Sequence, residues 1–453
     1  MRKSSSNLYP VLLVLVLSFC CIGNTNAALV ELKGKVIPMA GALPATVALH
    51  SYGDEGYMPS ILINKDSTFS IKVEVARAGL YYIRVMRSSL DVMLSANEKV
   101  TTVSITMNGD VLRDFQIERS PENDAYAAFK TSFNIYDGKL ISHFKSCEGG
   151  DSCEKKLHQI LEEYVQDLSE IKGKFKGTYT SEVLCPMKMP IVAKNVKNTT
   201  EEFRKGYFGK VDFADTAIFS TPVLKDMVAY YIGYFMEATL ISKQKEFLTY
   251  FTAKLKSNPF LLHKGAPIFF EDIFAAQREK LLVMFIDWYN IEDNKAKINN
   301  PVLDMKIKNV SRVLPGMPYI NLTGTDTAGG SRALKEVVDR SKCTLLLFWS
   351  SECSHCRDEM PFIKEYYEKY HSKGFDVYAM SFDNDPTKWK NFIIDKGLSW
   401  TNVRIDRGLS PNPVVDYVAT STPTLVLIDS KGNIVHRFMP KSRLEDHIIE
   451  VLK

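Results

Sequence analysis

The pattern of apolar and polar residues changes twice along the chain, and it predicts three regions of different structure. From residue 28 to residue 118 the period is two, which is typical of half-buried β-strands. The clearest run alternates Phe69, Ile71, Val73 and Val75 with polar residues. Asn108-Gly109 then favours a type I′ turn between two further strands. This region is predicted to be an all-β, sandwich-like module.

The middle region, residues 119–300, has a helical period and is predicted to be an α-helical domain. One apolar face is formed by Leu157, Ile160, Leu161, Tyr164, Leu168 and Ile171. A second long amphipathic helix is predicted from Ile273 to Trp288. We expect a linker after it, rich in Asn, Pro and Gly and running to Pro318.

In the last region, residues 301–453, strands and helices alternate, and this order predicts an α/β domain. Strands are expected at residues 345–349, 377–381, 425–428 and 434–438, and helices from Cys353, after Pro386 and over residues 443–452. The chain is therefore predicted to be multidomain, with a β module, a helical middle and a C-terminal α/β domain.

The N-terminus, residues 1–27, is predicted to be a signal peptide. A basic start is followed by a short apolar run, residues 11–17, and by small residues that end at Ala27. The apolar run is too short for a membrane span. A lipid anchor at Cys20 or Cys21 is a second interpretation, although neither cysteine follows the small residue that a lipoprotein cleavage site prefers. We expect the mature protein in the periplasm or cell envelope.

Length, composition and charge narrow the classes of function. A chain of 453 residues is expected to form about three domains. With 45% hydrophobic and 24% charged residues it has the composition of a folded, soluble protein. The formal net charge of +4 comes without a dense basic stripe, so nucleic acid is not expected as a partner.

Six cysteines follow the predicted signal peptide, and an even number in an exported chain is typical of disulfide bonding. Cys147 and Cys153 flank a glycine-containing loop between two predicted helices, and we interpret them as a structural disulfide. Cys185 and Cys343 fit two alternatives, a bridge between domains or buried free thiols. The sequence does not select among the pairings.

The remaining two cysteines, Cys353 and Cys356, are three positions apart where a predicted strand meets a predicted helix. Unpaired N–H groups and the helix dipole stabilise a thiolate at such a position and lower the pKa of the first thiol. The second thiol lies one turn later on the same face. One thiolate can therefore attack a disulfide, and its neighbour can resolve the mixed disulfide that forms.

Other readings of the cysteine pair are weaker. A zinc site needs a second ligand pair, and the sequence offers no further Cys-x-x-Cys or His-x-His cluster, so no metal is expected. A static disulfide is unusual at the start of a helix, because structural bridges usually join distant segments. The prediction is a redox-active disulfide between Cys353 and Cys356, with no other cofactor.

A set of motifs around this pair resembles a known family. The motifs are Phe348-Trp349-x-x-x-Cys353-x-x-Cys356-Arg357-x-Glu359-x-Pro361, then Ser381-Phe382-Asp383, then Ser421-Thr422-Pro423-Thr424 before an apolar strand. Together they are similar to the thioredoxin fold, in particular its TlpA/ResA-like branch of exported thiol-disulfide oxidoreductases. The resemblance covers roughly residues 313–453 and is loose for the first two modules.

The resemblance implies roles for individual residues. Cys353 matches the nucleophile and Cys356 the resolving thiol. Trp349 matches an aromatic residue beside the site and is expected to contact the substrate. Pro423 matches a cis-proline that faces the cysteines, with Thr422 offering its backbone to an extended substrate peptide. Catalytic Glu359 matches an acid that exchanges a proton with the resolving thiol, and its alternative is a solvated helix carboxylate.

The residues between the cysteines, Ser354 and His355, are expected to tune the redox reaction. A histidine at this place can stabilise the Cys353 thiolate, and such stabilisation makes the disulfide more oxidising. The direction of electron flow therefore stays open.

The function expected from the sequence is that of an exported enzyme that reduces disulfides of envelope proteins. Its partners would be protein thiols and disulfides, and a membrane protein would supply electrons. The alternatives are a disulfide oxidase or isomerase, and a binding protein with a redox-sensing domain.

Overall fold

The computed structural model describes residues 27–52, 60–237, 239–405, 412–437 and 441–453. The predicted signal peptide, with Cys20 and Cys21, lies almost wholly outside these residues. The chain divides into two compact units, the first made of Met1–Glu237 with Phe251–Lys264 and the second of Ala238–Tyr250 with Gly265–Lys453. The domain boundaries expected near residues 118 and 300 stay a prediction. None of the described helices combines the length and the apolar character that a membrane span requires.

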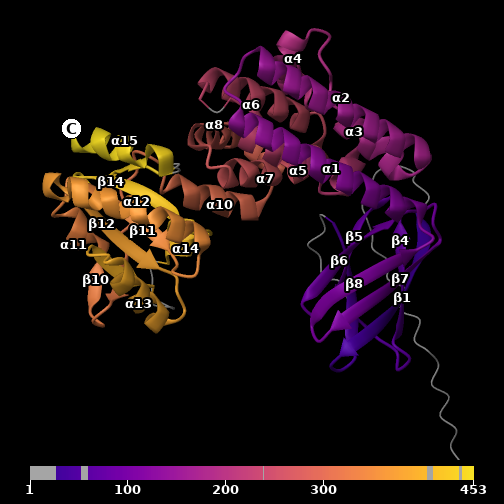
Figure 1. The fold of residues 1–453 in the computed structure, drawn as a ribbon, viewed down its shortest axis with the longest axis horizontal. Helices are drawn as coiled ribbons and strands as arrows, with labels where there is room; N and C mark the ends of the chain where they lie inside the picture. Colours follow the sequence, from indigo (N-terminus) through magenta and orange to yellow (C-terminus); the bar gives the residue numbers. More distant parts are fainter. Residues whose placement is uncertain (1–26, 53–59, 238, 406–411, 438–440) are drawn as a thin grey trace, which may run out of the picture. The chain divides into compact units, whose positions relative to one another are not determined.

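The first unit begins with two four-stranded sheets, drawn in indigo to purple in Figure 1. Their orders are β4-β1-β7-β8 and β3-β2-β5-β6. The strands are β1 (Ala28–Ala40), β2 (Thr46–Ser51), β3 (Ser60–Leu62), β4 (Thr68–Val75), β5 (Gly79–Val85), β6 (Ser88–Leu94), β7 (Val100–Asn108) and β8 (Val111–Glu118). Alternate residues of both sheets meet in one apolar core, among them Ile71 of β4 and Ile83 of β5. The predicted sandwich is confirmed.

The turn between β7 and β8 differs from the prediction. Asn108 pairs with Val111, so the two turn residues are Gly109 and Asp110 rather than Asn108 and Gly109. Gly109 has φ +62°, and Asp110 is not among the described residues with positive φ. One positive φ at the first turn position is the signature of a type II′ turn, which glycine adopts without strain. The type I′ prediction was wrong because the register places Asn108 inside the strand.

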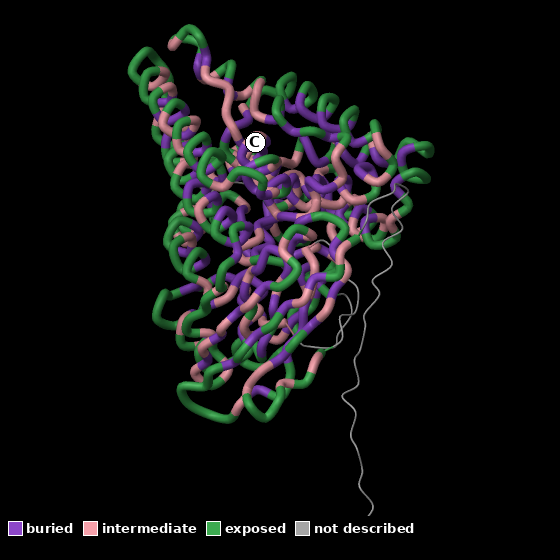
Figure 2. The backbone as a smooth tube through the Cα atoms, turned by 90° about the vertical axis from the view of Figure 1, so that its right-hand side faces the viewer, coloured by how far each residue is buried: buried purple, intermediate pink, exposed green. Residues whose placement is uncertain are grey.

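The helices of the first unit follow directly after the sandwich. They are α1 (Pro121–Ser146), α2 (Asp151–Lys174), the π-helix η1 (Thr180–Leu184), α3 (Cys185–Lys188), η2 (Val196–Asn198), α4 (Thr199–Gly206), η3 (Thr216–Phe219), α5 (Val223–Tyr230) and the π-helix η4 (Tyr231–Phe235). All six residues of the apolar face predicted on α2 are buried. Exposed and buried faces alternate along the helices in Figure 2.

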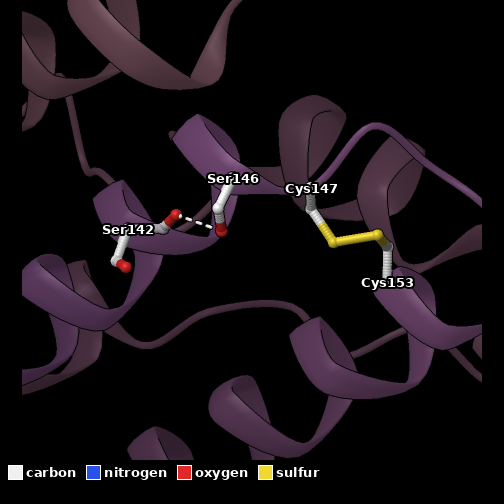
Figure 3. The surroundings of a disulfide bond; sticks show 4 residues. All are labelled: Ser142, Ser146, Cys147 and Cys153. Carbon is white, nitrogen blue, oxygen red and sulfur yellow. Dashed lines mark hydrogen bonds between the residues drawn. A yellow bond between two sulfur atoms is a disulfide. The ribbon is translucent and has the colours of Figure 1, made fainter.

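A disulfide joins α1 and α2 (Figure 3). Cys147 caps the C-terminus of α1, and Cys153 lies in the first turn of α2, with 5.9 Å between their Cα atoms. The rings of Tyr136 and Tyr164 stack between the same two helices at a centroid distance of 4.6 Å. The interpretation of these cysteines as a structural disulfide is confirmed.

Two predictions about the later helices were wrong. The chain from Ile273 to Trp288 is not one helix. Helix α7 (Pro259–Ala275) ends near the start of this segment, and a separate helix, α8 (Glu279–Tyr289), follows after a short turn. Gln277 between them has φ +54°, and the N–H of Arg278 donates to the carbonyl of Ile273, as in a Schellman motif. The remaining helices here are α6 (Ile241–Lys256), α9 (Glu292–Ile298) and α10 (Pro301–Ser311).

Helix α10 occupies much of the segment that was predicted to be a linker. The side chain of Asn300 caps it by accepting a hydrogen bond from the N–H of Leu303, and Pro301 takes the first helical position. Both residues favour a helix start for these reasons. The Asn-Pro pair therefore marks the beginning of a helix in this chain.

The second unit contains a seven-stranded sheet of order β10-β9-β13-β12-β11-β14-β15, drawn in orange and yellow in Figure 1. Its strands are β9 (Thr323–Asp326), β10 (Ser331–Ala333), β11 (Cys343–Trp349), β12 (Phe375–Ser381), β13 (Thr401–Arg404), β14 (Thr424–Asp429) and β15 (Ile434–His436). Strands β11, β12 and β13 run parallel, and β14 runs antiparallel to β11. The α/β prediction is confirmed, although β9, β10 and β13 were not expected.

Two apolar layers cover this sheet. Alternate residues of central strand β11 point to opposite faces, for example Leu345 and Leu347 to one and Leu346 and Phe348 to the other. The first layer includes residues of α12 (Ser354–Tyr370), α13 (Pro386–Lys396) and α15 (Lys441–Leu452). The second includes α11 (Leu334–Val338), and the short helix α14 (Pro413–Asp416) lies in the same domain. A strand buried on both faces holds its ends rigidly.

The disulfide in Figure 3 predicts a stability effect. Replacing both Cys147 and Cys153 by serine should lower the unfolding free energy of the first unit by about 2 kcal/mol, because a short covalent loop restricts the unfolded chain. Urea unfolding followed by circular dichroism measures this change. Adding a reductant to the wild-type chain should reproduce the shift and leave the double variant unchanged. Equal midpoints for oxidised wild type and variant would contradict the prediction.

Candidate active site

The two cysteines of the Cys-x-x-Cys motif lie where β11 meets α12. Strand β11 ends at Trp349, a short loop follows, and Cys353 takes the N-cap position of α12. No disulfide joins Cys353 and Cys356 in this structure. The strand-to-helix junction predicted from the sequence is therefore confirmed. It places one sulfur beside the unpaired N–H groups of a helix start.

The thiol of Cys353 is half-buried, and its sulfur donates a hydrogen bond to the carbonyl oxygen of Thr422 at 3.3 Å. Burial by itself would raise the pKa of Cys353. Hydrogen bonds from the side chain of Thr422, from the backbone and thiol of Cys356 and from the backbone of His355 outweigh it, and the pKa is lowered. These backbone groups are the second and third N–H of the helix, which an N-cap acceptor normally binds. Ionisation thus exchanges the bond to Thr422 for bonds that favour the thiolate.

The second cysteine, Cys356, has the opposite environment. Its side chain is 1% exposed and belongs to the apolar layer over the sheet. Burial raises its pKa to about 12, and the hydrogen bond to Cys353 adds to the increase. The two thiols therefore differ as the chemistry requires, with an accessible acidic sulfur and a buried neutral one.

The segment that faces the nucleophile comes from the start of β14. The peptide bond between Thr422 and Pro423 is cis, as predicted. Strand β14 pairs with β11 through Phe348 and Thr424, and this pairing brings Thr422 to Cys353. Both Thr422 and Pro423 are partly exposed, so a bound peptide can reach them.

Sequence reasoning did not identify the residue that holds the loop before Cys353. The carboxylate of Asp383, 4% exposed, accepts hydrogen bonds from the hydroxyls of Ser350 (3.0 Å), Ser351 (2.9 Å) and Ser381 (2.6 Å). It also accepts from the backbone N–H of Ser351, at 2.9 and 3.1 Å from its two oxygens. One buried anion therefore ties the loop to the end of β12. Asp383 appeared only within a family motif, which gave it no role.

Two predicted site residues lie deeper than their expected roles suggest. Trp349 is 0% exposed, and its ring packs against Phe392 at a centroid distance of 5.4 Å. It belongs to the same buried apolar layer as Cys356, and Cys353 packs against this layer. Glu359 is half-buried on α12, about one turn beyond Cys356. Their substrate-binding and proton-transfer roles stay predictions.

The two residues between the cysteines are both exposed. The backbone N–H of His355 helps to lower the pKa of Cys353. The expectation that the side chain of His355 tunes the thiolate stays a prediction. Ser354 provides the first residue of α12.

The other described thiols are separate from this site. Cys185 and Cys343 are free and buried, and burial raises the pKa of each to about 12. Of the two alternatives, the structure shows buried free thiols.

These pKa differences predict selective alkylation. In the reduced chain iodoacetamide should modify Cys353 first, with a pH midpoint below the ordinary thiol pKa of about 8.5, because its thiolate is stabilised. The rate should fall about tenfold per pH unit below the midpoint, while the buried thiols stay unmodified. Mass spectrometry of peptides measures each rate. Labelling of Cys353 no faster than in the urea-unfolded chain would refute the assignment.

The carboxylate of Asp383 gives a second prediction. Asp383→Ala should lower kcat/KM by about ten- to a hundredfold, because the loop loses its anchor and Cys353 its fixed geometry. The pKa of Cys353 should rise toward the ordinary range, and stability should fall by about 1–3 kcal/mol.

The matched control is Asp385→Ala, which removes the N-cap of α13 and is expected to cost about 1 kcal/mol. It should leave the alkylation pH profile of Cys353 unchanged. If both variants shift this profile equally, Asp383 acts only on stability.

Solved structures with a similar chain include the thioredoxin domain of a thiol-disulfide oxidoreductase from Bacteroides vulgatus. It is 26% identical, and the match covers 31% of this chain and 99% of that one, with a TM-score of 0.30. A thiol:disulfide interchange protein from Bacteroides sp. is 27% identical. The match covers 30% of this chain and 90% of that one, with a TM-score of 0.29.

A family profile described as thioredoxin-like matches residues 341–434. Curated relatives named thiol-disulfide oxidoreductase ResA match part of the chain. The Bacillus anthracis protein is 32% identical over 134 residues, which cover 29% of this chain and 75% of the relative. The protein from Halalkalibacterium halodurans is 29% identical over 140 residues, which cover 30% of this chain and 77% of the relative. The chain, which carries Cys353 and Cys356 at the start of α12, belongs to the ResA-like thiol-disulfide oxidoreductases of the thioredoxin fold.

Proposed function

We propose that this oxidoreductase is exported and reduces disulfides of proteins in the periplasm or cell envelope. The observation that carries the proposal is the contrast between the two thiols of one motif. Cys353 is accessible with a lowered pKa, and Cys356 is buried with a pKa raised to about 12. Export rests on the pattern of residues 1–27, and the envelope location follows from export.

The proposed reaction has two exchange steps. The Cys353 thiolate attacks one sulfur of the substrate disulfide, whose S–S bond breaks and releases the other sulfur as a thiolate. Cys356 then loses its proton and attacks the Cys353 sulfur, which frees the second substrate sulfur and leaves a Cys353–Cys356 disulfide. The substrate gains two electrons and the enzyme loses two.

The proton of Cys356 needs an acceptor, because its pKa lies far above neutral. Glu359, about one turn further along α12, is the residue we propose for this role. The two electrons must then be returned to the enzyme. We propose a membrane redox protein as their source, since an envelope enzyme lacks the cytosolic reductants.

The direction of electron flow depends on how strongly the thiolate is stabilised. A strong disulfide oxidase has a strongly stabilised thiolate, which favours its reduced form. Here neutral hydrogen-bonding groups lower the pKa of Cys353, and burial opposes them. We propose the reductase direction, and the reduction potential of the cysteine pair distinguishes it from that of an oxidase.

The substrate would bind as an extended peptide beside Thr422 and Pro423. The carbonyl of Thr422 already faces the Cys353 sulfur, so a peptide aligned with this backbone brings its disulfide to the nucleophile. Main-chain pairing of this kind accepts many sequences. It suits an enzyme that acts on several proteins.

The test is disulfide reduction by the mature chain, with insulin as the probe substrate. Cys353→Ser should abolish turnover, whereas Cys356→Ser should accumulate mixed disulfides with client proteins, because the resolving thiol is missing. Cys185→Ala, a buried cysteine of the other unit, is the matched control and should keep full activity. Turnover that survives Cys353→Ser would overturn the proposal.

Two further measurements separate the parts of the proposal. The reduction potential of the Cys353/Cys356 pair should be near that of thioredoxin, about −270 mV, and a value near −120 mV would identify an oxidase instead. Glu359→Gln should slow release of the mixed disulfide and leave the first attack unchanged. An unaltered release rate would remove Glu359 from the mechanism.

A further inference from the structure

A group of three metal-ligating side chains lies in the second unit and takes no part in the proposed redox reaction. It consists of His436 on β15 and of His447 and Glu450 on α15. One ligand atom of each lies within 4.8 Å of those of the other two. We propose that this group, the His-His-Glu cluster, binds a divalent transition-metal ion of the Zn²⁺ class.

The distances within the cluster fit a common coordination sphere. Glu450 Oε2 is 3.6 Å from Nε2 of His436 and 3.5 Å from Nδ1 of His447. A tetrahedral zinc ion with ligands at 2.0–2.1 Å has edges of about 3.3 Å between its ligand atoms. Small side-chain adjustments would therefore place all three atoms on one ion.

The backbone elements that carry the ligands are fixed by the core. His436 pairs in register with Leu427 of the neighbouring strand β14. Helix α15 packs on the same sheet through buried Leu444 and Ile448, the latter next to His447. His447 and Glu450 are three residues apart and so lie on one face of the helix. The cluster is thus assembled by the domain itself.

The two histidine rings of the cluster lie close together, with centroids 3.7 Å apart and an angle of 33° between the ring planes. Neutral imidazole and ionised carboxylate are the forms in which these side chains bind a metal ion, so such binding depends on pH.

The donor set indicates which ions fit. Two imidazole nitrogens and one carboxylate oxygen suit zinc and its neighbours better than Ca²⁺ or Mg²⁺, which prefer oxygen ligands. The carboxylate side chain is 69% exposed, whereas the histidine side chains are 23% and 13% exposed. The cluster is therefore open to solvent on the side of Glu450, where water can complete the coordination. An ion held here would join the edge strand β15 to the C-terminal helix.

The experiment is Zn²⁺ titration of the untagged mature chain, followed by calorimetry and by the shift in melting temperature. The protein is first oxidised to the Cys353–Cys356 disulfide, because free thiolates also bind zinc. We expect one equivalent to bind and to raise the melting temperature. Co²⁺ in place of Zn²⁺ should give a visible spectrum with nitrogen and oxygen ligands.

Variants identify the ligands. His436→Ala, His447→Ala and Glu450→Gln should each weaken binding by more than about tenfold, with the histidine changes the stronger. Asp446→Asn is the matched control, since it removes an exposed carboxylate from the same helix and should leave the affinity unchanged. All four variants, once reduced, should keep the lowered pH midpoint of Cys353 alkylation, which shows that the domain is folded.

Two results would overturn the assignment. One is the lack of any Zn²⁺ binding or melting shift in the oxidised wild-type chain. The other is binding that the three ligand variants leave as strong as in Asp446→Asn. Neither result depends on disulfide reduction, so the zinc proposal and the redox proposal are tested by separate measurements.

Discussion

The hydrogen bonds to the buried carboxylate of Asp383 are the constraint on which the active site depends. They join the end of β12 to the loop after β11, and this loop delivers Cys353 to the start of α12. The N–H of Ser351 is buried and needs an acceptor that solvent cannot provide. A charged acceptor makes stronger bonds than a neutral one and fixes the loop in one conformation. The geometry at the sulfur therefore follows from a residue that takes no part in the exchange of bonds.

Given that fixed junction, one motif yields two thiols of different character. The position of each cysteine decides whether its pKa is lowered or raised, because Cys353 takes the N-cap position and Cys356 faces the apolar layer. The backbone N–H groups of the first turn favour the anion, and burial penalises it. Among the free thiols that the structure describes, burial raises the pKa of Cys185, Cys343 and Cys356, and only at Cys353 do hydrogen bonds outweigh burial. The spacing in the sequence brings the two cysteines together, and the fold gives them different pKa values.

Patterns local in sequence allowed most of the fold to be predicted. The period-two strands, the apolar face of α2 and the strand-to-helix position of Cys353 all depend on neighbours a few residues away. Contacts between distant segments could not be predicted in this way. Asp383 meets its serines only because β11 and β12 pair, and His436 meets His447 only when α15 packs on the sheet. The helix break at Gln277 was missed for another reason, since glutamine carries no sequence signal for a positive φ.

The burial of Cys185 and Cys343 has a consequence for the enzyme's own integrity. A protein that exchanges disulfides is exposed to attack from each mixed disulfide it forms, and a nearby spare thiol could divert that intermediate into a dead-end pairing. Both spare thiols are enclosed, and burial raises the pKa of each to about 12. They are therefore poor nucleophiles while the chain is folded. Their burial therefore protects the chain's own thiols during the disulfide exchange that we propose.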